Sequence, residues 1–285
     1  MNKFNPIIQV DDDGLHVPEV REWSIEKYRL VGQYCDIFTA GMKHSWDQLV
    51  YIDLFAGAGY AFVKDSNRVV LNAALIAMNI PNTFSKYILC ELDLKRYNAL
   101  KKRVKRDYPH LNVVIYNGDS NDPKIIKCIK NSIPPFKKGN TLLSFCFIDP
   151  FSLNLKLSMV RQLANLQMDF LILQALTMDA KRNESIYLNE NNTKISEYLG
   201  MPNWRDVYDV SPEKQEKNFV LFLANQFQNQ MVKMGYIRNR NMHQIKSNVK
   251  NLSLYYLAFY SKHKTGERFF KEIQKRANPQ TKMDL

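Results

Sequence analysis

Hydrophobic residues first recur at a helical spacing in the segment that begins at Trp23. The apolar positions of this segment lie three or four residues apart, at Ile25, Tyr28, Val31, Cys35 and Phe38. This spacing predicts an amphipathic helix that ends near Gly41. Residues 1–22 are polar and then acidic, and they predict an extended N-terminal arm.

Short apolar runs then alternate with amphipathic segments. The strand-like runs are Leu49–Ile52, Lys86–Glu91, Asn112–Tyr116, Thr141–Ile148 and Met168–Ala175, and the helical segments are Asn72–Asn79, Asp93–Tyr108, Asp122–Asn131 and Leu157–Leu166. Near-continuous apolar strands that alternate with amphipathic helices are typical of a parallel sheet covered on both faces. The predicted fold class is therefore α/β, with a doubly wound, mostly parallel sheet.

The rest of the chain is predicted to complete the same domain. Residues 176–234 combine polar stretches with a small helix at Ile195–Leu199 and a long helix that Gly235 ends, and they predict a helical insertion. Two candidate strands follow, at Tyr236–Arg238 and Leu252–Tyr260, and then a helix from about Gly266 to Arg276. No linker separates a second domain, so we expect an arm over residues 1–22 and one domain over residues 23–285.

Four polar motifs follow four successive predicted strands. They read Asp53-Leu-Phe-Ala-Gly57-Ala-Gly59, Glu91-Leu-Asp93, Asn117-Gly-Asp119-Ser120 and Asp149-Pro-Phe151. Ligands bind at the carboxyl ends of the strands in open α/β sheets, so this placement predicts a single site. The glycines allow a sharp turn and close approach of the backbone to a ligand. No Gly-Lys-Ser/Thr sequence follows, which excludes a phosphate-binding P-loop, and the missing third glycine disfavours a dinucleotide fingerprint.

The second and third motifs suit contacts with a nucleoside, although each has a structural alternative. Glu91 is placed to accept hydrogen bonds from ribose hydroxyls, whereas Asp93 suits the N-cap of the helix that follows. Asp119 and Ser120 suit an adenine amino group, but the same residues also form turns.

The fourth motif suits an acceptor with an amino group. Asp149 and the loop carbonyls can accept hydrogen bonds from that group, Pro150 fixes the backbone where the strand ends, and Phe151 can stack on a base. The alternative is a plain strand exit from which Phe151 returns to the core.

These motifs resemble those of class I S-adenosylmethionine-dependent methyltransferases. The resemblance implies a seven-stranded sheet with a C-terminal antiparallel hairpin, at about Gly235–His243 and Leu252–Tyr260. It implies S-adenosylmethionine as cofactor and an acceptor site at Asp149, Pro150 and Phe151. The implied cofactor residues are Asp53, Phe55, Ala56, Gly57, Gly59, Glu91, Asp119 and Ser120.

A narrower resemblance, from about Trp23 to Ile273, is to the three-Cys-motif partner family of bacteria. It is carried by Tyr51–Gly59, Ile88–Asp93, Phe145–Phe151 and Tyr255–His263. It implies a methyltransferase-like fold and a partner protein that carries the three cysteines. Asn72 stands where the family tends to have Ser and is not counted among the cofactor residues.

Composition narrows the partners and the compartment. The net charge is +12, and Asp93–Tyr108 carries a basic face, which suits nucleic acid but also ordinary solubility. The four cysteines and five histidines show no metal or triad spacing, so we expect no metal. No apolar run reaches the roughly 20 residues of a membrane span, and residues 1–13 are no secretory signal, so we expect a cytoplasmic protein.

Two hypotheses follow. The first is a methyltransferase that uses S-adenosylmethionine to methylate an amino group of a nucleobase in RNA or DNA. The second is a non-catalytic methyltransferase-like subunit that binds a three-Cys-motif protein or nucleic acid. A nicotinamide-dependent oxidoreductase is disfavoured by the glycine spacing.

Overall fold

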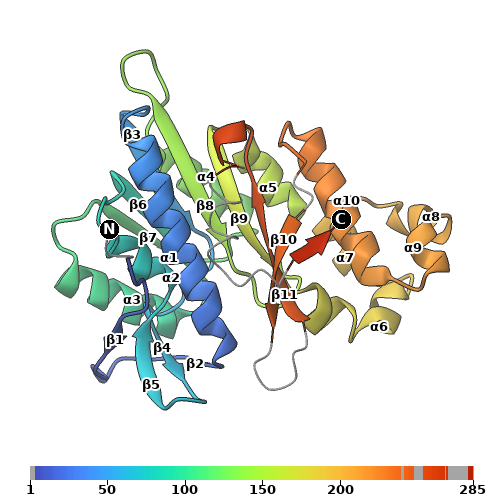
Figure 1. Ribbon diagram of the computed structural model, residues 1–285, viewed down its shortest axis with the longest axis horizontal. Coiled ribbons are helices and arrows are strands. Elements are labelled where there is room, and N and C mark those ends of the chain that lie inside the picture. Colours follow the sequence, from blue (N-terminus) through green and yellow to red (C-terminus); the bar gives the residue numbers. More distant parts are fainter. Residues whose placement is uncertain (1–3, 239–240, 247–252, 267, 269–281, 285) are drawn as a thin grey trace.

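A central sheet of eight strands organises the described part of the chain. The computed structural model describes residues 4–238, 241–246, 253–266, 268 and 282–284. The strands of this sheet, in spatial order, are β12 (Lys282–Asp284), β10 (Asn241–Lys246), β11 (Ser253–Tyr260), β9 (Met168–Gln174), β8 (Leu142–Ile148), β3 (Gln48–Asp53), β6 (Lys86–Glu91) and β7 (Val113–Asn117). Figure 1 shows the sheet near its edge, with helices on both sides.

The pairing of these strands confirms the predicted fold class. From β9 to β7 every neighbouring pair is parallel, whereas β11 runs antiparallel to both β9 and β10. This is a doubly wound, mostly parallel sheet with a C-terminal antiparallel hairpin, which β10 and β11 form. β12, which the sequence pattern did not predict, pairs with β10 as an additional edge strand.

Helices cover the two faces of the central sheet because alternate strand residues point to opposite sides. Leu49 and Tyr51 pack against α1 (Trp23–Met42), α2 (Ala73–Met78) and α3 (Leu94–Asp107). Val50 and Ile52 belong to the opposite core, with α4 (Pro123–Ser132), α5 (Leu157–Ala164) and α10 (Phe219–Lys233). Because the five strands from β9 to β7 are parallel, their carboxyl ends lie at the same edge of the sheet. The four polar motifs lie at this edge.

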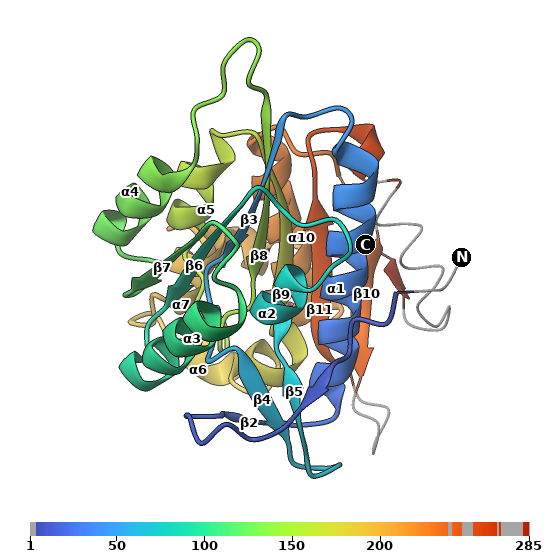
Figure 2. The same ribbon diagram turned by 90° about the vertical axis from the view of Figure 1, so that its left-hand side faces the viewer.

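A second sheet of four short strands lies beside the ends of α1 and α2 (Figure 2). It consists of β1 (Gln9–Val10), β5 (Arg68–Leu71), β4 (Tyr60–Val63) and β2 (Glu19–Val20), in that order. The sequence pattern placed the helical segment Asn72–Asn79 after the glycine loop, and α2 confirms it, but the β4–β5 hairpin between the loop and α2 was not predicted. The aromatic and β-branched residues of β4 and β5 favour a hairpin, and Asn67, at φ 48°, lies in its turn.

Residues 176–234 form a helical layer, seen at the right of Figure 1. Its elements before α10 are the π-helical turn η1 (Leu176–Ala180), α6 (Glu184–Leu188), α7 (Lys194–Leu199), α8 (Trp204–Asp209) and α9 (Pro212–Gln215). Trp204 has no exposed surface and packs its ring against Phe219 and Phe222 of α10.

Two C-terminal predictions differ from the structure or lie outside it. Residues 236–238 do not form a strand, and β10 begins at Asn241 instead. Tyr236 is buried, and its hydroxyl donates to the Met168 carbonyl. Most of the helix expected from about Gly266 to Arg276 lies outside the described residues. Within the described ranges, no helix combines the length and the hydrophobicity that crossing a membrane requires.

Candidate functional site

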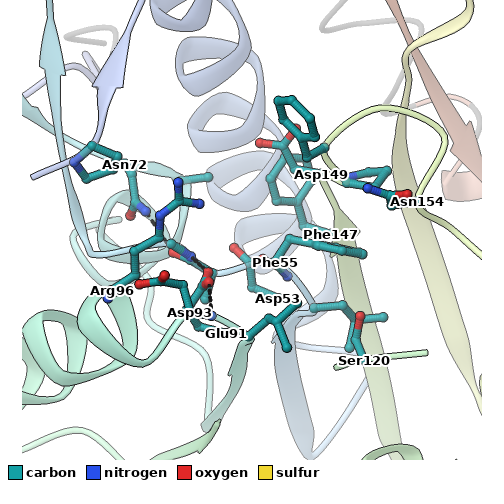
Figure 3. A pocket seen from close by; sticks show the side chains of 18 of the residues that line it. Asp53, Phe55, Asn72, Glu91, Asp93, Arg96, Ser120, Phe147, Asp149 and Asn154 are labelled. Carbon is teal, nitrogen blue, oxygen red and sulfur yellow. Dashed lines mark hydrogen bonds between the residues drawn. The ribbon is translucent and has the colours of Figure 1, made fainter. Parts of the chain in front are cut away.

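A cavity of about 1070 Å³ opens at the carboxyl ends of the parallel strands. Its lining contains every site residue that the sequence predicted except Gly59: these are Asp53, Phe55, Ala56, Gly57, Glu91, Asp119, Ser120, Asp149, Pro150 and Phe151. In Figure 3, Glu91, Asp93 and Arg96 lie on one side, Asp149 and Asn154 on the other, and Asp53 with Phe55 between them. The four motifs thus surround one space.

The glycine loop is held from two directions. The backbone N–H of Gly57 donates to Glu91 Oε2 at 2.8 Å, and Asn72 Nδ2 donates to the Ala56 carbonyl at 2.7 Å. Gly57 has φ +66°, and a Cβ there would lie 2.9 Å from Asn72 Nδ2. Asn72 also lines the cavity, so a residue left out of the predicted set helps to shape the loop.

Gly59 lies in the loop but outside the cavity lining, where it packs near Leu75. Its φ is +90°, and an added Cβ would lie 2.9 Å from a methyl carbon of Leu75. The prediction that Gly59 lies at the cofactor is not supported by its position, because it does not line the cavity. Its small size serves the packing of the loop on α2.

Glu91 connects the glycine loop with the helix that follows β6. Its Oε1 accepts from the Asp93 backbone N–H at 2.9 Å, while Oε2 accepts from Gly57. Asp93 caps α3 by accepting from the Arg96 backbone N–H at 2.8 Å, which confirms its predicted N-cap role. A carboxylate has about four lone-pair sites, so Glu91 retains capacity to accept hydrogen bonds from a ligand.

The third motif contains both the predicted turn and an unpaired hydroxyl. Asp119 Oδ1 accepts from the Asn121 backbone N–H at 2.8 Å, as in the turn alternative. Ser120 is only 2% exposed, and its Oγ has no hydrogen-bond partner among the described residues. A buried hydroxyl without a partner is costly, and Ser120 lines the cavity. This wall therefore fits a ligand with polar atoms, such as a nucleoside.

Asp53 is a buried acid beside the same cavity. It is 1% exposed and accepts hydrogen bonds from the Phe55 backbone N–H at 3.0 Å and the Tyr51 hydroxyl at 3.2 Å. Burial raises the pKa of Asp53 to about 7, although the bond from Phe55 opposes the rise. A cationic group in the cavity would stabilise its ionised form, and the ammonium of an amino acid is such a group.

Asp149 forms an ion pair that the sequence did not predict. Its Oδ2 accepts from Lys27 Nζ of α1 at 2.5 Å, and the Lys27 side chain is 8% exposed. Burial alone lowers the pKa of a lysine, but the adjacent Asp149 carboxylate outweighs it and raises the pKa of Lys27 above its ordinary value. Both members of the pair line the cavity, and Lys27 remains charged.

Phe151 stands at the cavity mouth and does not return to the core. Its side chain is 86% exposed, and the following residue, Ser152, adopts φ +63°. Asp179 of η1 holds this loop by accepting from the Ser152 hydroxyl and from the Leu153 backbone N–H at 2.9 Å. The plain strand exit considered for Asp149-Pro-Phe151 is therefore wrong.

Metal ligation and disulfide bonding find no support in the described part of the chain. No three His, Cys, Asp or Glu side chains there cluster in a way that holds a metal ion. The four cysteines are free thiols: Cys35, Cys90 and Cys146 are buried, whereas Cys128 is exposed.

Comparison with known proteins adds only distant likenesses. No family model matches the sequence, and no curated protein does. Protein LPL1258 from Legionella pneumophila is 11% identical, with a TM-score of 0.47 over 90% of this chain and 95% of that one. TYW2 from M. jannaschii, in complex with AdoMet, is 10% identical, with a TM-score of 0.43 over 92% and 90% of the two chains. TYW2 from P. horikoshii, in complex with MeSAdo, is 11% identical, with a TM-score of 0.42 over 91% and 73%.

Proposed function

We propose that the protein is an S-adenosylmethionine-dependent methyltransferase that acts on an amino group of a nucleobase in RNA or DNA. The observation that supports this most is the division of one cavity into two unlike halves. One half holds the glycine loop, Asp53, Glu91 and Ser120, and the other holds the Lys27–Asp149 pair and Phe151. A donor and an acceptor bound in these halves would lie next to each other.

In the cofactor half, each polar group has a counterpart on S-adenosylmethionine. Ionised Asp53 would bind the ammonium of its amino-acid end, Glu91 its ribose hydroxyls, and Ser120 with Asp119 its adenine. Gly57 lets the backbone approach closely because it has no Cβ. When bound there, the cofactor supplies an electrophilic methyl group.

In the acceptor half, the chain binds and orients the base. Asp149 accepts a hydrogen bond from the amino group, and Phe151 offers an exposed ring on which the base can stack. Alignment of the two reacting centres supplies most of the rate, because the chemistry resides in the cofactor. A base from a duplex has to be flipped out to reach this depth.

The narrower resemblance belongs to the same proposal. Within the three-Cys-motif partner family, the protein would act beside a protein that carries the three cysteines. The four free thiols suit a reducing compartment such as the cytoplasm. The N-terminal arm would form part of the acceptor wall, since Pro18, Glu19 and Arg21 line the cavity.

Three measurements test the proposal. Mass spectrometry of the purified protein identifies any ligand that co-purifies, and calorimetry measures its affinity for S-adenosylmethionine. We expect Asp53→Ala to abolish this binding and the exposed Asp206→Ala, in α8, to leave it unchanged. Unchanged affinity of Asp53→Ala would remove Asp53 from the cofactor site. Labelled methyl groups should then enter RNA or DNA, and labelling of protein alone would contradict a nucleobase acceptor.

A second candidate function is a non-catalytic subunit that binds nucleic acid or a protein partner. The exposed lysines of α3, among them Lys95, Lys101, Lys102 and Lys105, favour it because they offer a basic face without reacting groups. Affinity for S-adenosylmethionine without methyl transfer to RNA, DNA or protein would support this alternative.

A further inference from the structure

The first turns of α1 form a wall of the acceptor half. Trp23, Ser24, Lys27 and Tyr28 all line the cavity, at positions that share one helix face. The Trp23 ring lies 4.6 Å from the ring of Tyr255, measured between centroids, and the two are inclined by 30°. These rings and the exposed Phe151 provide flat apolar surfaces, which suit a flat heteroaromatic ligand.

The same wall also carries polar groups. Lys27 Nζ lies 5.5 Å from the Trp23 centroid and 5.0 Å from the Tyr28 centroid, and it donates one hydrogen bond to Asp149. An ammonium has three protons to donate. Ser24 is fully buried, and its Oγ lacks a partner within the described residues. The wall thus offers donors beside the acceptor oxygens of Asp149.

An acceptor, Asp149, next to a charged donor, Lys27, can distinguish the amino groups of different bases. On the Watson–Crick edge, the amino group of adenine adjoins the unprotonated ring nitrogen N1, and that of cytosine adjoins N3. The amino group of guanine adjoins a protonated ring nitrogen, which an ammonium cannot pair with. A flipped base is read on this edge, so the pair matches adenine and cytosine and rejects guanine.

We propose, building on the proposed function, that Lys27 donates a hydrogen bond to the ring nitrogen next to the amino group that is methylated. Asp149 accepts from the amino group at the same time. The acceptor is then N6 of adenine or N4 of cytosine. Its lone pair would form the new N–C bond as the bond from the methyl carbon to the cofactor sulfur breaks, and the nitrogen would then release one proton to water. The hydrogen bond from Lys27 to Asp149 Oδ2 also fixes the position of that side chain next to the donor.

Substrate analogues test this in the wild-type protein, where folding is not in question. Single-stranded oligonucleotides carry one adenine, one 1-deazaadenine, one cytosine, one 3-deazacytosine or one guanine in an otherwise constant uracil or thymine context. The deaza bases retain the amino group but replace the ring nitrogen by C–H. We expect transfer to adenine or cytosine, with kcat/KM for the matching deaza base about tenfold to hundredfold lower, as for loss of a hydrogen bond to a charged group.

Variants of Lys27 test whether this residue causes the preference for the natural base over its deaza analogue. Lys27→Met should lower kcat/KM for the natural base and abolish the preference over the deaza base, whereas Lys27→Arg should retain part of it. Lys27→Met combined with Asp149→Asn avoids leaving a partly buried carboxylate without its partner. Arg29→Met, an exposed position on the same helix, is the matched control and should behave like the wild type.

The outcomes separate the inference from the function on which it rests. Equal rates on a natural base and its deaza analogue, or transfer to guanine alone, would overturn the role of Lys27 while the methyltransferase proposal stands. A Lys27→Met protein that still prefers the natural base would overturn it as well. No transfer to any of the five strands would contradict the proposed function itself.

Discussion

Arg103 donates hydrogen bonds to both carboxylate oxygens of Asp13, from Nη2 at 2.6 Å and from Nε at 3.0 Å. Its side chain has no exposed surface, and its Nη1 donates to the Ala58 carbonyl at 2.7 Å. The guanidinium also lies 3.9 Å from the centre of the Tyr60 ring. One arginine of α3 therefore holds the N-terminal arm against the glycine loop.

Replacing this arginine should weaken both the fold and the cofactor site. Arg103→Met removes two donors from the Asp13 carboxylate, which keeps the one from Arg106, and removes the side-chain donor to the Ala58 carbonyl. We therefore expect the free energy of unfolding to fall by about 2–4 kcal/mol. Affinity for S-adenosylmethionine should fall too, because Ala58 lies in the loop. Urea denaturation and calorimetry measure the two effects. Lys102→Met, an exposed neighbour, is the control; a urea midpoint equal to that of the wild type would contradict the bracing role of Arg103.

Acid should weaken the ion pair between Arg103 and Asp13. The hydrogen bond from Arg103 holds the pKa of Asp13 down at about 2, whereas an unfolded Asp titrates near 3.9. A carboxyl with a lowered pKa stabilises the fold above the unfolded value, and this contribution is lost as pH falls toward the folded value. We expect the stability difference between wild type and Asp13→Asn to be constant above about pH 5 and to shrink toward pH 2. A difference that does not change over this range would argue against an ionised pair.

The cofactor half of the site could be predicted from the sequence because its residues lie at or just after the carboxyl ends of the strands. Near-continuous apolar runs indicate parallel strands, and parallel strands end at one edge. Glu91 and Ser120 could therefore be placed without knowledge of any side-chain contact.

The acceptor half was harder to predict because its parts are distant in the sequence. Lys27 and Asp149 are 122 positions apart, and a lysine in an amphipathic helix is usually exposed. The feature of the sequence that could have indicated Lys27 as a site residue is its position on one helix face with Trp23, Ser24 and Tyr28. The β4–β5 hairpin was missed because four-residue strands give little periodicity.

The conformation of the loop that carries Phe151 should depend on Asp179. Besides its two bonds to that loop, Asp179 accepts from Asn183 Nδ2 at 2.6 Å and from the Tyr187 hydroxyl at 2.7 Å. Asp179→Asn turns an acceptor oxygen into a donor that faces other donors, so Ser152 should leave its φ of +63°. We expect the rate of methyl transfer to fall at least tenfold, since small displacements of a bound group are costly, with affinity for S-adenosylmethionine within twofold of wild type. Equal loss of both quantities would indicate general destabilisation, and Asp206→Asn serves as the control.

Asp53 should reduce stability in the absence of cofactor. Its folded pKa of about 7 exceeds the unfolded value, so the folded state holds a proton that the unfolded state releases above about pH 4. Stability from this group therefore falls as pH rises from about 4 to 7. We expect Asp53→Asn to be more stable than wild type at pH 8 by roughly 2–4 kcal/mol, at about 1.4 kcal/mol for each pKa unit. Urea titrations at pH 5 and pH 8 measure this; an advantage that does not grow with pH would contradict a raised pKa.

The same titration should govern cofactor affinity. In the proposed cofactor site only ionised Asp53 would attract the ammonium of S-adenosylmethionine, so wild-type affinity should rise as pH increases toward about 7. Asp53→Asn should bind weakly at every pH, although its fold is more stable. Calorimetry between pH 5.5 and 8.5 makes the comparison, and a flat wild-type profile would show that Asp53 does not contact the charged end.

The basic face of α3 should bind single-stranded nucleic acid. Lys101, Lys102 and Lys105 are exposed on one side of the helix, and each phosphate that a lysine neutralises releases counterions. Changing all three to Gln should weaken binding of a single-stranded RNA and reduce the slope of log K against log salt by about 0.7 for each phosphate that is no longer neutralised. Lys124, Lys127 and Lys130 of α4, changed together to Gln, remove the same charge on the opposite face of the sheet and provide the control. If both triple variants lose affinity equally, net charge rather than the α3 face attracts the nucleic acid, and if neither does, α3 is free to meet a protein partner.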